Sequence, residues 1–184
     1  MKSPSCFNQI WWGSALLVRV YLSGPIVHED HRPDEFYNVV TKTLRELDAY
    51  VFAPQFLPRL QPREIYTRDV SEVRTCDVLI AEVSNPSHGV GMEVMLAAHL
   101  SKPVLMFRRR GSRELSLMMQ GLPGKALFVY DHVEEVRSRL CSLDLSKLVI
   151  NECPRCGSGL AEVSSDSRVC VYCGGISGHD AIEP

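Results

Sequence analysis

The stretch "DVLIAEVSNPSHGVGMEV", residues 77 to 94, constrains the fold more than any other part of the chain. Its first seven residues form a near-continuous apolar run, which is typical of a strand buried on both faces of a parallel sheet. A turn with glycines follows, and the apolar periodicity then changes to that of a helix. A buried strand that leads through a glycine turn into a helix indicates an α/β protein.

The rest of the chain repeats this alternation of strand and helix. We predict strands at 17–23, 49–54, 77–83, 103–107 and 126–130. We predict helices at 34–47, with Asp34 as N-cap, and at 64–75, 90–101, 115–121 and 132–143; the proline-rich residues 54–63 are expected to form a loop. Such an alternation requires right-handed crossovers and therefore predicts a five-stranded parallel sheet with helices on both faces. Ligands bind such sheets at the carboxyl ends of the strands, where the strand order reverses.

The C-terminal residues carry a cysteine pattern of a different kind. Two CxxC pairs, separated by thirteen residues, contain Cys153, Cys156, Cys170 and Cys173. Four thiolates at this spacing predict a closed tetrahedral zinc site, which is structural because it leaves no open coordination position. A redox pair is the alternative. We predict two domains, a catalytic domain at 15–145 and a zinc ribbon at 150–177 that depends on zinc for its stability.

Composition limits the possible partners. The chain has 184 residues, of which 45% are hydrophobic and 23% charged, and its formal net charge is −2. This charge argues against a general nucleic-acid coat, and no apolar stretch has the length of a membrane span. Zinc-binding thiolates favour the cytoplasm. The basic run at 108–113 is either a solvated loop or a contact for a phosphate or a protein partner.

Glu93 is the acidic residue nearest the glycine turn. We expect it in the first turn of the helix, where the partial positive charge of the amides favours an ionised carboxylate. An ionised glutamate suits a nucleophile, or a group that stabilises a cationic transition state, although it could simply balance the helix dipole. Ser87, Gly89 and Gly91 surround it, and amides of such a turn can bind an anion such as phosphate.

Asp69 lies on the preceding predicted helix, at the same edge of the sheet as Glu93. Two carboxylates that face one pocket are the usual equipment for cleaving a glycosidic bond through an oxocarbenium-like state. The alternative is that Asp69 is an exposed helix charge paired with Arg68.

Several segments together resemble the nucleoside 2-deoxyribosyltransferase superfamily, and most closely its 2'-deoxynucleoside 5'-phosphate N-hydrolases. The segments are "VYLSGPI", "DVLIAEVSNPSHGVGMEV", "KPVLMF" and "LSLMMQG", and the likeness covers about residues 18 to 140. The resemblance implies a flavodoxin-like fold, a homodimer, no organic cofactor, and cleavage of the N-glycosidic bond of nucleotides.

The resemblance also implies roles for individual residues. Glu93 matches the nucleophilic or oxocarbenium-stabilising glutamate, Asp69 the aspartate that assists base departure, and Tyr21 the tyrosine that orients the nucleophile. The implied substrate-binding residues are Ser23, Gly24, Ile26, Ser87, Gly89, Gly91 and, reaching the neighbouring subunit's site, Ser116. Pro25 and Val27 stand where the hydrolases commonly have serine and arginine.

These features predict hydrolysis of (2'-deoxy)nucleoside 5'-monophosphates to free base and sugar phosphate. Two alternatives remain open: a transferase that moves deoxyribose between bases, and a non-catalytic nucleotide-binding adaptor. The zinc ribbon could contact protein or nucleic acid, and its acidic character favours protein.

Overall fold

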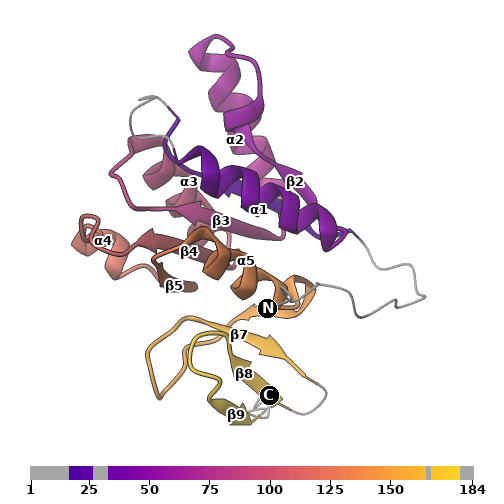
Figure 1. Cartoon of the computed structure of the whole chain (residues 1–184), viewed down its shortest axis with the longest axis vertical. Coiled ribbons are helices and arrows are strands. Elements are labelled where there is room, and N and C mark those ends of the chain that lie inside the picture. The colour runs from indigo at the N-terminus through magenta and orange to yellow at the C-terminus, as the bar shows by residue number, and fades with distance from the viewer. Residues whose placement is uncertain (1–16, 27–32, 165–166, 179–184) are drawn as a thin grey trace.

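Five parallel strands form the central sheet of the computed structural model, which describes residues 17–26, 33–164 and 167–178 (Figure 1). The strands are β1 (Arg19–Ser23), β2 (Tyr50–Phe52), β3 (Val78–Glu82), β4 (Val104–Arg109) and β5 (Lys125–Tyr130). Their order is β2-β1-β3-β4-β5, and every pair is parallel. The predicted five-stranded parallel sheet is confirmed. The order reverses between β1 and β3, so a ligand is expected at their carboxyl ends.

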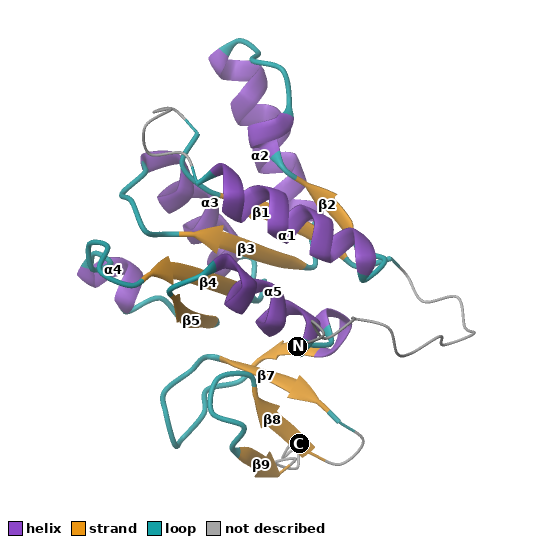
Figure 2. Cartoon of the chain, viewed as in Figure 1, coloured by secondary structure: helices purple, strands orange, loops and turns teal. Residues whose placement is uncertain are grey.

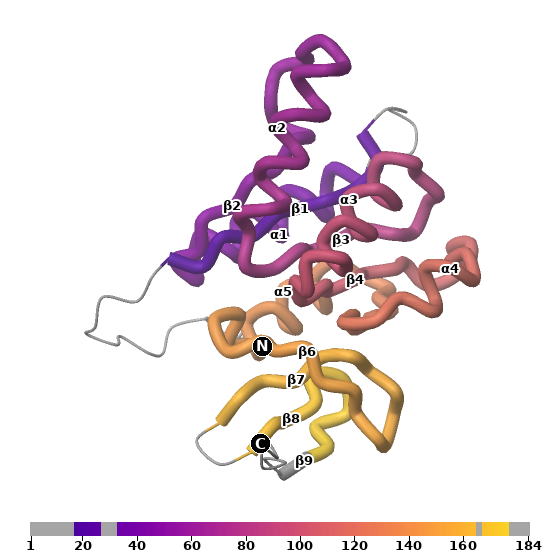
Figure 3. Tube along the Cα trace, turned by 180° about the vertical axis from the view of Figure 1, so that it is seen from behind, coloured from indigo at the N-terminus to yellow at the C-terminus, as the bar shows by residue number. Residues whose placement is uncertain are grey.

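Helices cover both faces of this sheet. One face carries α1 (Asp34–Glu46) and α5 (Val133–Cys141), and the other carries α2 (Pro62–Thr75) and α3 (His88–His99), as Figures 1 and 3 show from opposite sides. The short helix α4 (Leu117–Gln120) lies between β4 and β5 in the chain, and 3-10 turns occupy Pro54–Phe56 and Leu145–Lys147. Among the described residues, no helix combines the length and apolar character needed to cross a bilayer.

Alternating side chains of the strands build one apolar core on each face. Val20, Leu22 and Ile80 point towards α1 and α5, whereas Tyr21 and Leu79 point towards α2 and α3. Period-two alternation of a parallel strand produces this division. The side chains of consecutive residues in β1 and β3 therefore lie on opposite faces of the sheet.

Some predicted boundaries are wrong because the capping groups differ from those expected. The N-cap of α1 is Pro33, so Asp34 is the first helical residue rather than the cap. The predicted loop 54–63 contains a 3-10 turn and ends early, since α2 begins at Pro62 and not at residue 64. Proline suits the first helical position, and the carboxylate of Glu64 accepts the backbone N–H of Gln61 at 3.0 Å.

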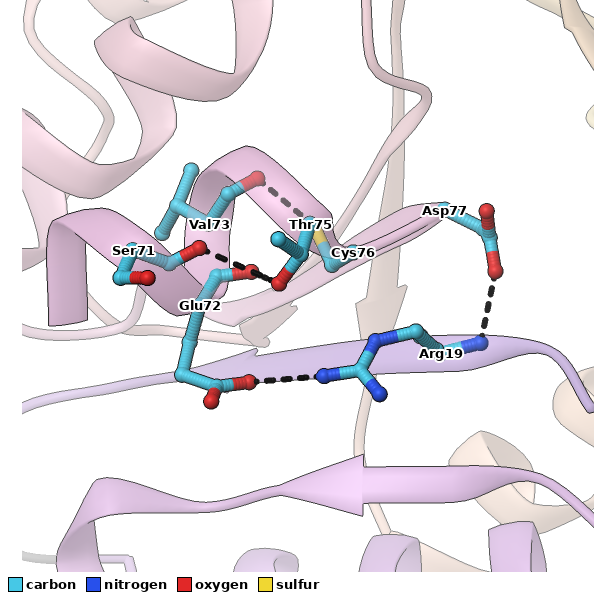
Figure 4. A network of polar contacts seen from close by, with 7 residues as sticks. All are labelled: Arg19, Ser71, Glu72, Val73, Thr75, Cys76 and Asp77. Atoms are coloured by element: carbon cyan, nitrogen blue, oxygen red, sulfur yellow. Dashed lines mark hydrogen bonds and ion pairs between the residues drawn. The ribbon is translucent and has the colours of Figure 1, made fainter. Parts of the chain in front are cut away.

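The C-terminal end of α2 is fastened to the start of β1 (Figure 4). The Arg19 guanidinium lies 3.2 Å from the Glu72 carboxylate, and the Arg19 backbone N–H donates to Asp77 at 2.8 Å. At the same end, the Cys76 thiol donates to the Val73 carbonyl. These contacts fix the base of α2 on the sheet, while its N-terminal half extends beyond the sheet in Figure 2.

The C-terminal residues form a second, antiparallel sheet. Its strands are β6 (Leu148–Ile150), β7 (Leu160–Val163), β8 (Ser167–Cys170) and β9 (Ile176–Gly178), in that order. It lies against the α/β part (Figure 2): Leu160 and Val171 belong to the same apolar core as α1 and α5, and Tyr172 stacks on Phe128 at 5.8 Å. The predicted separate unit therefore shares a core with its neighbour. The predicted limits 15–145 and 150–177 stay predictions.

Candidate active site

Glu93 lies one turn further into its helix than we expected. Because α3 begins at His88, with Ser87 as N-cap, Glu93 is in the second turn, and the first turn contains no acidic residue. The dipole effect falls off within the first turn. The helix N-terminus is therefore not what controls the charge of Glu93.

Two hydroxyl groups from β1 hold the Glu93 carboxylate. Tyr21 donates to Oε1 at 2.9 Å and Ser23 donates to Oε2 at 2.5 Å. Both donors are buried, and the Tyr21 ring stacks on Phe52 at 5.5 Å. Each carboxylate oxygen is thus oriented by a side chain that cannot move easily, as the role predicted for Tyr21 requires.

Burial sets the protonation of this carboxyl group. Desolvation raises the pKa of Glu93 to about 7, the hydroxyls of Ser23 and Tyr21 oppose the increase, and the charge of Asp69 adds to it. The pKa of Tyr21 is raised far above its ordinary range, mainly by burial and then by Glu93, so Tyr21 remains a donor. We expected the helix N-terminus to favour an ionised Glu93, whereas burial acts in the opposite direction and favours the protonated form.

Asp69 faces the same cavity from α2. Its carboxylate lies 2.7 Å from Nε of Arg68, so the predicted pairing with Arg68 is confirmed. The Asp69 side chain is nevertheless only 13% exposed, and it lines the cavity together with Glu93. Arg68 in turn lies 5.7 Å above the Phe52 ring, which links Asp69 to the aromatic pair beneath Glu93. The sequence did not identify this role of Arg68.

A cavity of about 970 Å³ opens between α2 and α3. Its walls are mainly apolar, with Leu60, Ile65, Tyr66, Val70, Val73, Met92 and Leu96 around the two carboxylates. This volume is at the upper end of ordinary small-molecule sites. The sequence predicted a helix at 64–75 but did not identify these wall residues. The apolar positions within that polar helix were the available signal.

The turn that precedes α3 leaves room for a ligand. The Ser87 hydroxyl makes no capping hydrogen bond. A Cβ atom at Gly91 would meet no atom within 4 Å, and one at Gly89 would meet only the Ser87 hydroxyl at 3.9 Å. Open space beside the N-terminus of a helix, whose first N–H groups have no partner within the helix, suits an anion.

The other predicted binding residues have different surroundings. Gly24 packs so closely on Tyr37 that a Cβ atom would lie 2.2 Å from the Tyr37 hydroxyl. Ile26 is exposed at the end of a described segment, and Val27 lies outside the described residues. Ser116 caps α4 by accepting the Met119 N–H at 3.3 Å, and it is not among the cavity residues of its own chain. Its predicted role at a neighbouring subunit's site stays a prediction.

The basic run at 108–113 is largely engaged in ion pairs. Arg110 lies 2.9 Å from Asp131, and Arg109 lies 4.0 Å from Glu35. Arg108 donates to the backbone carbonyl of Arg113. Arg108 and Arg109 belong to β4, and a turn follows them from Arg110. These contacts favour the alternative of a solvated surface segment.

The four cysteines of the second sheet converge on one point. Their Sγ atoms all lie within 4.8 Å of one another, with Cys153 to Cys173 at 3.7 Å and Cys156 to Cys170 at 3.6 Å. A tetrahedral zinc with Zn–S bonds of ordinary length needs sulfur atoms about 3.8 Å apart. Backbone N–H groups of Arg155 and Cys156 lower the pKa of Cys153 to about 7, which favours the thiolate. The donor set therefore fits a metal ion such as zinc.

Two relatives share part of this sequence. The 5-hydroxymethyl-dUMP N-hydrolase of Mus musculus is 44% identical over 73 residues, which are 39% of this chain and 42% of that protein. A putative 2'-deoxynucleoside 5'-phosphate N-hydrolase 1 of Thermofilum pendens is 37% identical over 87 residues, 46% of this chain and 61% of that protein. The matches thus span about half the length of these relatives.

Solved structures support the fold. The CMP N-glycosidase of Clostridium botulinum has a TM-score of 0.53 at 17% identity, covering 66% of this chain and 97% of that one. The 2-desoxiribosyltransferase from Leishmania mexicana has a TM-score of 0.51 at 22% identity, covering 68% and 97%. The family model for nucleoside 2-deoxyribosyltransferase matches residues 20–138. The chain belongs to the nucleoside 2-deoxyribosyltransferase family.

Proposed function

We propose that the protein hydrolyses the N-glycosidic bond of (2'-deoxy)nucleoside 5'-monophosphates. The observation that carries this proposal is the Glu93 carboxylate, which two buried hydroxyls hold at the wall of a largely apolar cavity that also contains Asp69. The two relatives described above, both named as N-hydrolases of deoxynucleotides, agree with it. Apolar walls suit a nucleobase, and a pair of carboxylates suits the sugar carbon.

The ionised form of Glu93 carries out the first step. One carboxylate oxygen forms a bond to C1' while the C1'–N bond breaks. The electron pair of the C1'–N bond leaves with the base, which takes up a proton from Asp69 or from solvent. Water then attacks C1', its hydroxyl stays on the sugar, its other proton passes to Asp69 or to solvent, and Glu93 is released as a carboxylate. Hydrogen bonds from Tyr21 and Ser23 favour the ionised form and orient it.

Asp69 acts on the leaving base. Its position on the cavity wall, with Arg68 holding one oxygen, suits orientation of the base or delivery of a proton to it. The phosphate of the substrate is assigned to the turn at Ser87, Gly89 and Gly91, because the Ser87 hydroxyl makes no capping bond and the two glycines leave space. Ser23, Gly24 and Ile26 remain predicted neighbours of the sugar phosphate.

The test is release of base from a panel of ribo- and deoxyribonucleoside 5'-monophosphates and free nucleosides. Glu93→Gln should lower turnover by about 10²–10³-fold, since it removes the charge that the transition state needs. Glu134→Gln, an exposed glutamate on α5, is the matched control and should retain the wild-type rate. Wild-type turnover by Glu93→Gln would refute the mechanism.

A transferase is the second candidate, because a cavity of about 970 Å³ has room for an acceptor base beside the bound sugar. With a nucleoside as donor, added free base should then yield a new nucleoside and not only free sugar. If the protein binds a nucleotide but cleaves none, this result would instead support the non-catalytic adaptor.

We further propose a homodimer in which Ser116 reaches the partner's site. Leu117 and Met118, the next two residues, are 84% and 74% exposed, and a second copy would cover such apolar side chains. Sedimentation of the wild type and of Leu117→Asp tests this: the wild type should be dimeric, and the variant should shift towards monomer.

Finally, we propose that Cys153, Cys156, Cys170 and Cys173 hold a structural zinc ion. Zinc would supply only cross-linking there, because four thiolates close its coordination sphere. We also propose a cytoplasmic location, where thiolates of this kind stay reduced. The exposed surface of this sheet is available for a protein or nucleic-acid partner, and we favour protein because the tail is acidic.

A further inference from the structure

A second buried carboxylate lies eleven residues before Glu93, on the opposite face of the sheet. Glu82 is the last residue of β3 and is fully buried. It points to the same side as Ile80, towards α1 and α5, whereas Glu93 meets Tyr21 on the side of α2 and α3. Burial of a carboxylate is costly unless it is fully hydrogen-bonded. Glu82 is therefore a feature that the proposed chemistry does not yet explain.

Hydrogen-bond donors from two strand ends satisfy Glu82. The Tyr130 hydroxyl at the end of β5 donates to Oε1 at 3.1 Å. The Ser84 hydroxyl donates to the same oxygen, and the Ser84 backbone N–H donates to both oxygens at 3.3 Å. All of these groups are donors, so the carboxylate acts as an acceptor that joins β5 to the residues following β3.

Ser84 is the point at which the chain leaves the sheet. The preceding residue, Val83, still donates its N–H to the Phe107 carbonyl of β4 at 2.9 Å. At the next position, the Arg109 N–H donates to the Ser84 hydroxyl at 2.8 Å instead of to a backbone carbonyl. Glu82 orients that hydroxyl by accepting a hydrogen bond from it, and so it fixes where the turn towards α3 begins.

We infer that Glu82 is a positioning residue for the substrate phosphate, acting through Ser84 on the turn that carries Ser87 and Gly89. Glu82, Ser84 and Tyr130 hold the start of the turn, and the N-terminus of α3 follows three residues later. The inference rests on the proposed function, because that function assigns the phosphate to this turn. Glu82 itself touches neither the substrate nor Glu93.

The test compares Glu82→Gln and Tyr130→Phe with the wild type. An amide cannot accept all the bonds that the carboxylate accepts, so Glu82→Gln leaves at least one buried donor of Ser84 or Tyr130 unsatisfied. Glu82→Gln should raise KM for the monophosphates about tenfold and leave kcat within about twofold. The kcat/KM for free nucleosides, which lack the phosphate, should not change. Tyr130→Phe, which keeps the ring in the core, should raise the same KM about threefold.

Amide hydrogen exchange provides a readout that does not depend on turnover. Both variants should speed exchange at residues 84–89 while α5 and β2 keep wild-type rates. Thr43→Val is the control, because it removes a buried hydroxyl of α1 outside this network and should change neither quantity.

The outcomes separate the inference from the proposed function. Equal losses of kcat on monophosphates and free nucleosides, or unchanged exchange at 84–89, would overturn the inference. If Glu82→Gln does not fold, Tyr130→Phe decides. If the wild type cleaves no nucleotide, the proposed function fails, and calorimetry with 2-deoxyribose 5-phosphate decides the inference: a Kd raised about tenfold in Glu82→Gln supports it, and an unchanged Kd refutes it.

Discussion

Glu93 and the cysteine cluster show two ways of building a site. Tyr21 reaches Glu93 across 72 residues of sequence, and a third element, α2, contributes Asp69 to the same cavity. Cys153 and Cys173 are separated by only 20 residues, and each pair of cysteines lies in one tight turn. The carboxylate site depends on the packing of the whole α/β fold, whereas the spacing of the cysteines alone nearly determines their cluster.

The two sites also differ in what burial does. Burial raises the pKa of Glu93 towards neutrality and so makes its charge depend on pH. In the cluster, backbone N–H groups lower the pKa of Cys153 to about 7, and a bound metal ion would hold the thiolates in their charged form. The first arrangement suits a group that changes state during a reaction, and the second suits a fixed cross-link.

Removing zinc should have the largest effect. It tests whether the cluster stabilises only the second sheet or also the α/β part. Zinc binding to such sites is worth about 10 kcal/mol or more at pH 7. Because Leu160 and Val171 share a core with α1 and α5, chelation should lower the melting temperature of the α/β part as well. Calorimetry with and without chelator, alongside a zinc assay, measures this.

Cys153→Ser should behave as the chelated protein does, and Cys76→Ser should not, because Cys76 lies outside the cluster. A metal-free protein with an unchanged melting temperature would show that the second sheet is stable without zinc. It would contradict the view that the cysteine cluster is a stabilising cross-link.

The pH dependence of stability is the next largest effect. The pKa of Glu93 rises from its ordinary 4.5 to about 7 on folding, so the folded state binds the proton more tightly. The resulting stability is fully present below about pH 4.5 and is lost as pH rises to about 7. The change amounts to up to about 3 kcal/mol. Denaturant titrations from pH 4.5 to 8 should show this loss in the wild type, and a flatter profile in Glu93→Gln.

Gly24→Ala tests how rigidly β1 holds the site. A Cβ atom at this position would overlap the Tyr37 ring, which is buried and whose hydroxyl donates to the Pro25 carbonyl. We expect a loss of about 1–3 kcal/mol in the free energy of unfolding, as for other overpacked cores. Turnover should fall too, since Ser23 is the adjacent residue. Gly89→Ala, which meets only one atom at 3.9 Å, should fold normally.

Ser23→Ala examines the charge of Glu93 directly. The Ser23 hydroxyl lowers the pKa of Glu93, so its removal should raise that pKa further above its wild-type value. Because the ionised form attacks the sugar, kcat/KM should increase with pH, and the midpoint of this increase should move upward by the same amount. A pH profile of wild type and variant measures it. A midpoint that moves downward would contradict the assigned role.

Much of the fold could be predicted from the sequence because its signals are local. The apolar runs of β3 and β4 and the glycine turn after β3 are short patterns, and they predicted a parallel sheet with its site at one edge. The cysteine spacing predicted the cluster in the same way. Helix starts were less accurate at Asp34 and Glu64, because capping depends on neighbouring backbone geometry.

The state of Glu93 could not be predicted, because it follows from long-range packing. Its second-turn position, the hydroxyl of Ser23 and the burial beneath α2 become apparent only when β1, α2 and α3 are assembled. For the same reason the sequence did not single out Glu82, whose partner Tyr130 lies 48 residues away.

Gly91→Ala should produce the smallest effects, and they should have opposite signs. Gly91 lies inside α3, and a Cβ atom there would meet nothing within 4 Å, so alanine should stabilise the helix by about 0.5–1 kcal/mol. The same methyl group would fill space that we assign to the phosphate, and KM for monophosphates should rise severalfold while free nucleosides are unaffected. Melting curves and steady-state kinetics measure the two effects. If the variant is more stable and equally active, the open side of the turn does not receive the phosphate. If it is more stable but binds monophosphates more weakly, then α3 gives up stability to leave space for the phosphate.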